Sequence, residues 1–273
     1  MKNIHKLVIT DLDGTLLKGD DIVPQSFLNL MHEMQAHGVR FAIASGRQYG
    51  IIKELFKDYY RNLLLIGDNG AAVYEGEQLI YKNPLAHDLI YKYREVIRKY
   101  PQLGLLYAGI KTSYCESANP ILLSNQKRFC HYPTSYKNLE DMLENDEIGK
   151  MAIYNFDEGA ANNVQLFAEY FDEADFVVSG KNWIDITTKH TSKGQALNFI
   201  KDHYHYQSED VIAFGDYNND ISMFKEAKYS YAMANANQEV KNCAYDVCLS
   251  NLEDGVTKKL EELFRAYIEH DLC

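Results

Sequence analysis

The feature that most constrains this chain is the stretch Leu7-Val8-Ile9-Thr10-Asp11-Leu12-Asp13-Gly14-Thr15-Leu16-Leu17. Its apolar run has the length and branching of a buried strand, which places Asp11 at the carboxyl end of that strand, where sites form in βα sheets. Two acids this close to a core, Asp11 and Asp13, repel each other, and a bound cation or a proton commonly offsets that cost. Asp-Gly is also frequent in turns, so this dipeptide alone is compatible with an ordinary turn that has no functional role.

Length and composition favour a folded protein of two domains. The chain has 273 residues, of which 46% are hydrophobic, enough to form a packed core. Lys plus Arg is 28 and Asp plus Glu is 39, so the net charge is −11. The lysines are scattered, and a surface this acidic repels nucleic acid and anionic lipid. We therefore expect neither a nucleic-acid partner nor a membrane partner.

Cysteine usage and hydropathy predict a cytoplasmic protein. The five cysteines are odd in number and show no CxxC spacing, which indicates neither a zinc site nor a disulfide framework. Free thiols fit a reducing compartment. The first apolar run, residues 7–10, is too short for the core of a signal peptide. No stretch approaches the roughly 20 apolar residues that cross a bilayer.

Strand and helix patterns alternate over the first and last parts of the chain. The expected strands are 7–10, 39–44, 63–66, 211–214 and 229–233, and the expected helices are 23–38, 48–59, 193–204 and 252–268. This alternation predicts a mostly parallel sheet with right-handed crossovers. Residues 68–71 follow the third strand and are expected to start a hairpin through residues 75–77.

Between these parts the strand and helix patterns no longer alternate regularly, and we expect an inserted α+β module over residues 84–184. The core would then comprise residues 1–83 and 185–273. Within the module the patterns predict helices over 85–100 and 160–171 and strands over 103–107, 111–115, 151–156 and 176–178. The segment 117–146 is polar and gives no clear pattern.

Two further strand-to-helix junctions carry groups suited to an anion. Ser45-Gly46 offers a hydroxyl, a backbone N–H and a helix N-terminus, which together suit a phosphate, although a serine that only caps the helix is also possible. Lys193 is predicted at the start of a helix, where the dipole disfavours a cation. An anionic ligand would hold it there, and a solvated lysine is the alternative.

A second acidic cluster, Gly215-Asp216-Tyr217-Asn218-Asn219-Asp220, follows the strand 211–214. Carboxylates and amides with no histidine or cysteine nearby suggest a hard, oxygen-seeking ion, with Mg²⁺ first. A turn rich in Asp and Asn would look similar in isolation. Together the four junctions supply two acid clusters, a hydroxyl and a lysine, which is a complementary set for phosphate chemistry.

These four segments resemble the four motifs of the haloacid dehalogenase-like superfamily. The insertion after the third strand, the sequence Asp68-Asn69-Gly70-Ala71 and the late Asp254-Gly255-Val256 are similar to its Cof-type phosphatases. The resemblance implies a Rossmann-like α/β core, a large inserted α/β cap that selects the substrate, and Mg²⁺ as the cofactor.

The resemblance also implies roles for individual residues. Asp11 would attack phosphorus and form an aspartyl-phosphate, and Asp13 would act as the general acid and base. The phosphoryl group would be held by Leu12, Ser45, Gly46, Lys193 and Asn219. Mg²⁺ would be held by the Asp11 carboxylate, the Asp13 main-chain oxygen, Asp216 and Asp220.

The function expected on this basis is a Mg²⁺-dependent phosphatase of small phosphorylated metabolites. Sugar phosphates are the first expectation, and flavin or pyridoxal phosphates are possible. Two alternatives remain open: a phosphomutase acting on sugar phosphates, and a non-catalytic metabolite-binding regulatory protein on the same scaffold.

Overall fold

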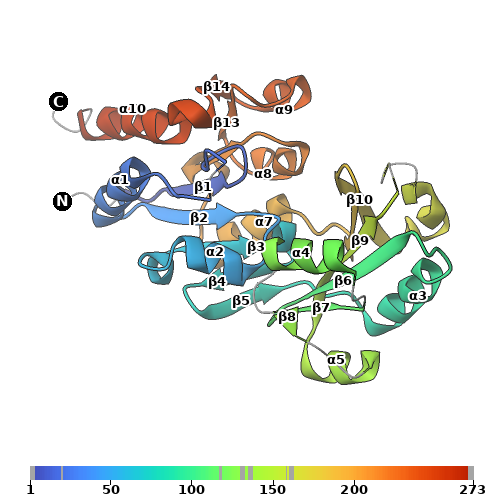
Figure 1. Ribbon diagram of the computed structural model, residues 1–273. Helices are drawn as coiled ribbons and strands as arrows, with labels where there is room; N and C mark the ends of the chain where they lie inside the picture. The colour runs from blue at the N-terminus through green and yellow to red at the C-terminus, as the bar shows by residue number, and fades with distance from the viewer. Residues whose placement is uncertain are drawn as a thin grey trace.

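Two sheets organise the protein, and a computed structural model describes residues 4–19, 21–116, 119–129, 133–134, 138–157, 159 and 163–269 (Figure 1). The first sheet comprises β1 (Leu7–Asp11), β2 (Arg40–Ala44), β3 (Leu64–Gly67), β4 (Ala72–Glu75), β5 (Gln78–Lys82), β12 (Val211–Gly215), β13 (Tyr229–Met233) and β14 (Asp246–Cys248). Its order is β14-β13-β12-β1-β2-β3-β4-β5. The strands from β14 to β3 pair in parallel, and β4 and β5 add an antiparallel edge. The predicted mostly parallel α/β core is therefore confirmed.

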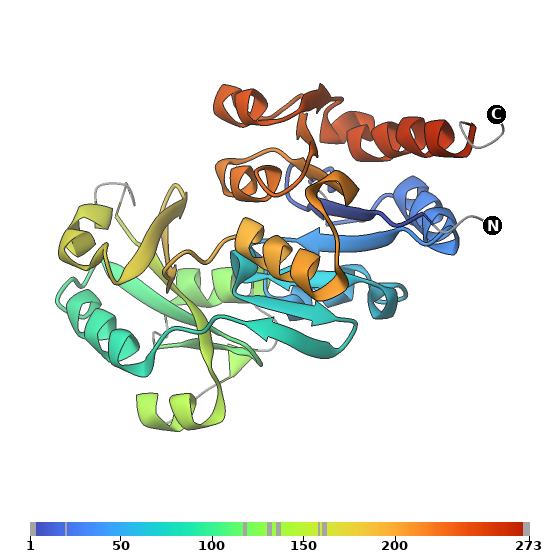
Figure 2. The same ribbon diagram turned by 180° about the vertical axis from the view of Figure 1, so that it is seen from behind.

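Helices cover both faces of this sheet because its strands are apolar on both sides. Val8 packs in one cluster with α1 (Gln25–Ala36), α2 (Tyr49–Leu55) and α10 (Gly255–Glu269). The alternate residues Leu7 and Ile9 pack in a second cluster with α7 (Lys193–Tyr204), α8 (Ile221–Phe224) and α9 (Gln238–Cys243). Figure 2 shows α7 in front of the strands when the molecule is seen from behind. A strand buried on both faces reads as a continuous apolar run, as these do.

Short 3-10 helices complete the core: η1 (Tyr60–Asn62), η2 (Asp68–Gly70), η4 (Ser208–Asp210), η5 (Asn218–Asp220) and η6 (Asn251–Glu253). The strand β14 and the helix α9 were not expected from the sequence, because both are short and their apolar pattern spans a single turn or pleat. Along the described ranges, no helix is both long enough and apolar enough to cross a membrane.

The second sheet, together with its helices, is called the cap from here on. Its strands are β6 (Leu103–Gly109), β7 (Ser113–Cys115), β8 (Pro133–Thr134), β9 (Ile148–Asn155), β10 (Ala174–Gly180) and β11 (Trp183–Thr188), in the order β10-β11-β9-β6-β7-β8. Its helices are α3 (His87–Ile97), α4 (Pro120–Phe129), α5 (Leu139–Asn145) and the 3-10 helix η3 (Gln165–Tyr170). Tyr93 of α3 and Phe167 of η3 are fully buried between the sheet and the helices.

Two expectations for the cap need correction. The predicted boundary between residues 184 and 185 falls inside β11, so the cap sheet extends to Thr188. The residues of β11 alternate between apolar and polar, which is the pattern of a strand with one buried face, and the sequence reading missed it. The helix expected over 160–171 is a 3-10 helix, η3, over Gln165–Tyr170, while residues 160–162 lie outside the described part.

The two chain segments that join the core to the cap run side by side and are hydrogen-bonded to each other. Asn83 Nδ2 donates to Thr191 Oγ1 at 2.9 Å. Thr188 Oγ1 donates to the carbonyl oxygen of Pro84 at 2.8 Å. The chain therefore enters and leaves the cap at one place on the core, next to the end of β5.

The core packing predicts a large cost for truncating Phe27, which is fully buried and meets the Phe41 ring edge-on at 6.0 Å between centroids. We expect Phe27→Ala to lower the free energy of unfolding by about 3–5 kcal/mol, because it leaves a cavity in a packed interior. Leu252→Ala, at a side chain that is 68% exposed, is the control and is expected to stay within about 0.5 kcal/mol. Urea denaturation measures both, and equal losses would contradict this packing.

Candidate active site

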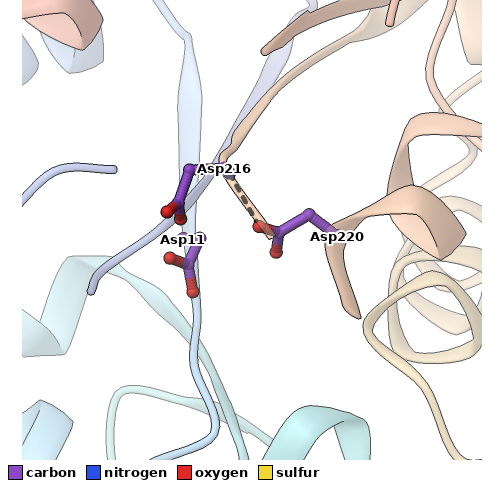
Figure 3. A group of neighbouring side chains, drawn as sticks. All are labelled: Asp11, Asp216 and Asp220. Atoms are coloured by element: carbon purple, nitrogen blue, oxygen red, sulfur yellow. Dashed lines mark hydrogen bonds between the residues drawn. The ribbon is translucent and has the colours of Figure 1, made fainter. Parts of the chain in front are cut away.

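The carboxyl ends of two neighbouring parallel strands, β1 and β12, bring three of the four predicted acidic residues together. Asp11 ends β1 and lies opposite Ala44, the last residue of β2. Asp216 follows the last residue of β12, which pairs with the other side of β1. Figure 3 shows the carboxylates of Asp11, Asp216 and Asp220 directed toward one another. One carboxylate oxygen of each lies within 4.8 Å of the others.

Lys193 occupies the centre of this arrangement. Its Nζ lies 2.5 Å from Asp11 Oδ1 and 2.7 Å from Asp220 Oδ1, and the residue is only 1% exposed. Burial disfavours the ammonium charge, but the two carboxylates more than offset this and raise the pKa of Lys193. The unfavourable position of a cation at the start of α7 is thereby explained. Ser192 caps that helix, accepting from the Gln195 N–H at 3.1 Å.

The site carries an excess of negative charge. Burial, together with Asp220 and Asp216, raises the pKa of Asp11 to about 8 despite the opposing effect of Lys193. Burial also raises the pKa of Asp216 to about 6. When all three carboxyls are ionised they exceed the one ammonium by two negative charges, which a divalent cation would balance, and the raised pKa of Asp11 means that such a cation would replace the proton on that carboxyl. Hard oxygen ligands without nitrogen or sulfur suit Mg²⁺, so these residues fit the ion that the sequence predicted.

The loop after β12 is built around the Asp220 side chain. Its Oδ2 accepts from the backbone N–H groups of Asp216 at 2.9 Å and Tyr217 at 3.1 Å, and the first of these bonds is drawn in Figure 3. Gly14, at φ +82°, lets the β1 loop approach, since a Cβ there would lie 2.3 Å from Asp216 Oδ2. Asp220 therefore fixes both Lys193 and the position of Asp216.

Asp13 lies at the mouth of the site, apart from the three clustered acids. Its side chain is 57% exposed, and the Arg47 guanidinium donates to both of its oxygens, at 2.9 Å from Nε and 2.5 Å from Nη2. Arg47 also donates to Asp21 at 2.6 Å, and these acids raise the pKa of Arg47 even though burial opposes it. No role for Arg47 was predicted from the sequence.

The other predicted phosphate-binding residues surround the same point. Gly46 borders the cavity, whereas Ser45 is fully buried and its Oγ accepts from the Arg47 N–H at 3.1 Å. Leu12 is fully buried, and its carbonyl accepts from the N–H groups that follow it in the β1 loop. Leu12 and Ser45 can therefore reach a ligand only through their backbone or hydroxyl groups at the edge of the loop.

The turn η2, predicted as the start of a hairpin and similar to a sequence of the Cof-type phosphatases, is also part of the site. Asp68 and Asn69 have φ of +49° and +56°, a backbone region that Asp and Asn tolerate better than most residues. Asn69 Oδ1 accepts from Asn219 Nδ2 at 2.9 Å. A Cβ on Gly70 would lie 2.2 Å from the Ser192 carbonyl oxygen, so the turn packs directly on the start of α7. The consecutive Asp-Asn-Gly is the sequence signal for this conformation.

A cavity of about 600 Å³ lies between these core loops and the cap. Its core wall includes Asp11, Asp13, Gly46, Arg47, Asp68, Asn69, Lys193, Asp216, Tyr217, Asn218 and Asn219, and its cap wall includes Leu106, Ala108, Lys150, Ala152, Val177, Val178, Trp183, Asp185 and Thr187. Lys150 Nζ lies 3.2 Å from the Gly46 carbonyl oxygen and 3.4 Å from Asp68 Oδ1. A cap residue thus contacts the core beside the acidic cluster.

Comparison with known proteins agrees with this geometry. A family model described as haloacid dehalogenase-like hydrolase matches residues 8–260. The chain belongs to the haloacid dehalogenase-like hydrolases. The family match confirms the resemblance to the Cof-type branch. Because the members of this family are hydrolases, the protein is an enzyme.

Relatives of this hydrolase match it over nearly its whole length. It is 26% identical to phosphatase YwpJ of Bacillus subtilis, covering 94% of this chain and 99% of that protein. It is 25% identical to 5-amino-6-(5-phospho-D-ribitylamino)uracil phosphatase YbjI of Escherichia coli, covering 95% and 96%. The crystal structure of SMU.1108c from Streptococcus mutans has a TM-score of 0.84 at 28% identity, covering 95% of this chain and 99% of that one.

The buried ion pairs of Lys193 predict a pH-dependent loss of stability in Lys193→Met. In metal-free buffer at pH 8, we expect a loss of about 3–5 kcal/mol, because two buried carboxylates lose their counter-charge. The raised pKa of Asp11 means that the folded state retains a proton that the unfolded state releases between pH 3.8 and about 8. Lys193 opposes the effect of burial, so without it the pKa of Asp11 rises further and the variant loses more stability than the wild type as pH rises. The deficit of the variant should therefore shrink toward pH 4.

Urea denaturation at several pH values with EDTA measures this deficit. Lys228→Met, at a lysine that is 50% exposed, is the matched control and should change stability little at any pH. A deficit in Lys193→Met that is independent of pH would show that the buried carboxylates do not carry the effect.

Proposed function

We propose that this protein is a Mg²⁺-dependent phosphatase that hydrolyses small phosphomonoesters through an aspartyl-phosphate on Asp11. The observation that carries the proposal is the position of the Asp11 carboxylate. It lies at the floor of a cavity, paired with a buried ammonium and surrounded by two further acids. Phosphoryl transfer needs such positioning and charge neutralisation more than any other catalytic device.

In the first step, an Asp11 oxygen forms a bond to phosphorus while the bond to the leaving-group oxygen breaks. Asp13, at the mouth of the cavity, gives a proton to that departing oxygen. Arg47 holds the Asp13 side chain at the mouth of the cavity. Lys193, Asn219, the Ser45 hydroxyl, the Gly46 N–H and the backbone that follows Leu12 are the groups that would balance or bind the phosphoryl oxygens.

In the second step, Asp13 removes a proton from a water molecule that attacks phosphorus, and the bond from Asp11 to phosphorus breaks. Inorganic phosphate leaves, and Asp11 is restored as a carboxylate. Mg²⁺ bound by Asp11, Asp216, Asp220 and the Asp13 carbonyl would supply positive charge to the phosphoryl oxygens. Asp220 would act in support, since its oxygens already bind Lys193 and the loop N–H groups.

Support for hydrolysis over the two alternatives comes from the complete residue set and from the relatives. A regulatory protein on this scaffold would not need both Asp11 and Asp13 together with Lys193 and the acidic cluster. A phosphomutase would need the same residues, so only the product separates it from a phosphatase. The curated relatives YwpJ and YbjI are named phosphatases, which favours hydrolysis.

The substrate class we propose is a small phosphorylated metabolite of the cytoplasm. Sugar phosphates, flavin phosphates and pyridoxal phosphates all present a phosphomonoester on a compact leaving group. Relatives from Escherichia coli and Bacillus subtilis are named as phosphatases of a ribitylaminouracil phosphate, at 25% and 26% identity. The net charge of −11 gives no support for a nucleic-acid substrate.

The proposal predicts that Asp11→Asn abolishes turnover of p-nitrophenyl phosphate and that Asp13→Asn lowers kcat by about 100-fold to 10,000-fold. Asp11→Asn removes the nucleophile of the first step, and Asp13→Asn removes the group that transfers protons in both steps. EDTA should abolish activity, and added Mg²⁺ should restore it. Asp202→Asn, at an exposed position of α7, is the control and should turn over normally.

Released inorganic phosphate and the reaction products are measured together. Inorganic phosphate with no isomerised ester identifies a phosphatase, whereas an isomerised sugar phosphate identifies a mutase. Activity retained in Asp11→Asn would overturn the mechanism.

A further inference from the structure

The segment 45–48, which follows β2, is held by the core through two of its carbonyls. The Asn69 N–H donates to the Ser45 carbonyl at 2.9 Å, and the Asp68 N–H donates to the Arg47 carbonyl at 3.0 Å. Both donors belong to η2, the turn that also packs on the start of α7. The core thus fixes the first and the third carbonyl of this segment.

The carbonyl between these two belongs to Gly46 and is held by the cap. Lys150 Nζ donates to it at 3.2 Å. The N–H of the same peptide group is that of Arg47, and it donates to Ser45 Oγ at 3.1 Å. Because a peptide group is planar, bonds to its oxygen and to its N–H together fix its orientation. The peptide group that leads into Arg47 is therefore oriented by a cap side chain.

Gln48, on the other side of Arg47, also binds the cap. Its Nε2 donates to the Gly109 carbonyl at 2.9 Å and to the Thr112 carbonyl at 3.3 Å. The Gln48 side chain is only 5% exposed, so these bonds satisfy an amide that is shielded from water. Contacts with the cap thus flank Arg47 on both sides.

The cap groups that make these contacts are held by the cap itself. The loop 109–112 lies between β6 and β7 and is folded around Asp146, a buried residue. Asp146 accepts from the Lys111 N–H at 3.1 Å and from the Thr112 N–H at 3.2 Å. Lys150 belongs to β9, which pairs with β6 on one side and β11 on the other. Groups fixed in advance lose little freedom when they bind a neighbouring segment.

Lys150 also balances two buried carboxylates, one from the core and one from the cap. Its Nζ lies 3.4 Å from Asp68 Oδ1 and 3.2 Å from Asp185 Oδ2. Burial raises the pKa of Asp68, and the Lys150 ammonium opposes this rise. Without the ammonium, the two acids would face each other across the contact between core and cap. Lys150 therefore stabilises the position of the cap seen in the structure, which is called docked from here on.

We propose that Lys150 and Gln48 are positioning residues: through them the docked cap orients Arg47, and Arg47 in turn holds the Asp13 carboxylate for proton transfer. The inference rests on the proposed phosphatase function and adds two residues to its catalytic arrangement. Arg47 is suited to this part because its guanidinium donates to both oxygens of Asp13, and such a two-pronged pair has a defined direction. The Asp13 side chain is 57% exposed, so packing restrains it little.

The test uses two esters of similar shape whose leaving groups differ in basicity. The p-nitrophenolate ion departs with little help from a proton, whereas the phenolate ion is more basic and depends more on the general acid. Because kcat/KM reports the step that forms the aspartyl-phosphate, a misplaced Asp13 should slow phenyl phosphate more than p-nitrophenyl phosphate. We expect Lys150→Met to lower kcat/KM about tenfold more for phenyl phosphate, which is a fraction of the full contribution of a general acid. Gln48→Met, which removes the other contact, should give the same pattern.

A double variant tests whether Lys150 acts through Asp13. In the Asp13→Asn protein the positioned group is absent, so adding Lys150→Met should change kcat/KM for phenyl phosphate by less than about threefold. Losses that multiply in the double variant would show that Lys150 acts independently of Asp13 and would overturn the inference.

The matched control is another lysine that joins core and cap. Lys82 of β5 pairs with Glu147, and both side chains are nearly half exposed. Lys82→Met removes a contact between the two parts without touching the segment 45–48, so kcat/KM for both esters should stay within about twofold of the wild-type values. Thermal melting of each variant confirms that it is folded, and Gln48→Met keeps the test open if Lys150→Met does not fold.

The outcomes separate this inference from the proposed function. Equal losses on the two esters in the folded variants, or the same leaving-group dependence in Lys82→Met, would overturn the positioning role while leaving the phosphatase in place. No Asp11-dependent turnover of either ester would overturn the proposed function itself, and this inference with it.

Discussion

The arrangement of the site depends on the buried ammonium of Lys193, which lies between Asp11 and Asp220. An unpaired charge at that depth would be strongly unfavourable, so each of the three groups requires the others. Asp220 in turn binds the backbone of the loop that carries Asp216. One ion-pair network therefore joins the end of β1, the start of α7 and the loop after β12. With its carboxyls ionised, this network carries more negative than positive charge, and the three acids lie close enough together to hold a divalent cation.

Much of the core and its acidic site could be predicted from the sequence, because the responsible signals are local. Apolar runs that end in polar turns mark the parallel strands, and in such a sheet their carboxyl ends meet at one edge. That is why Asp11 and Asp216 could be expected to converge, whereas Lys193, at the start of α7, was linked to them by its unfavourable position at a helix N-terminus. The complementary chemistry of these residues, rather than any one motif, made the expectation specific.

The parts that escaped prediction depend on contacts between distant segments. Arg47 binds Asp13 across 34 residues of sequence, and Lys150 reaches Gly46 across 104 residues. Neither pairing leaves a periodic pattern in the chain. The strand β11 does leave one, but it directly precedes the return to the core, and the predicted boundary cut through it. The role of Asn69 was hidden for another reason: Asp-Asn-Gly indicates a turn, and only the fold shows that this turn also supports Asn219.

The paired segments that join core and cap have a consequence for how such enzymes diversify. Because Asn83 bonds to Thr191 and Thr188 bonds to Pro84, the insert begins and ends at adjacent points. An insert of this kind can be exchanged for another of different size without altering the register of the eight-stranded sheet. The acidic cluster of the core would stay constant while the cap is replaced. A single scaffold could thus acquire new leaving-group preferences through recombination of whole modules, with no compensating change in its catalytic residues.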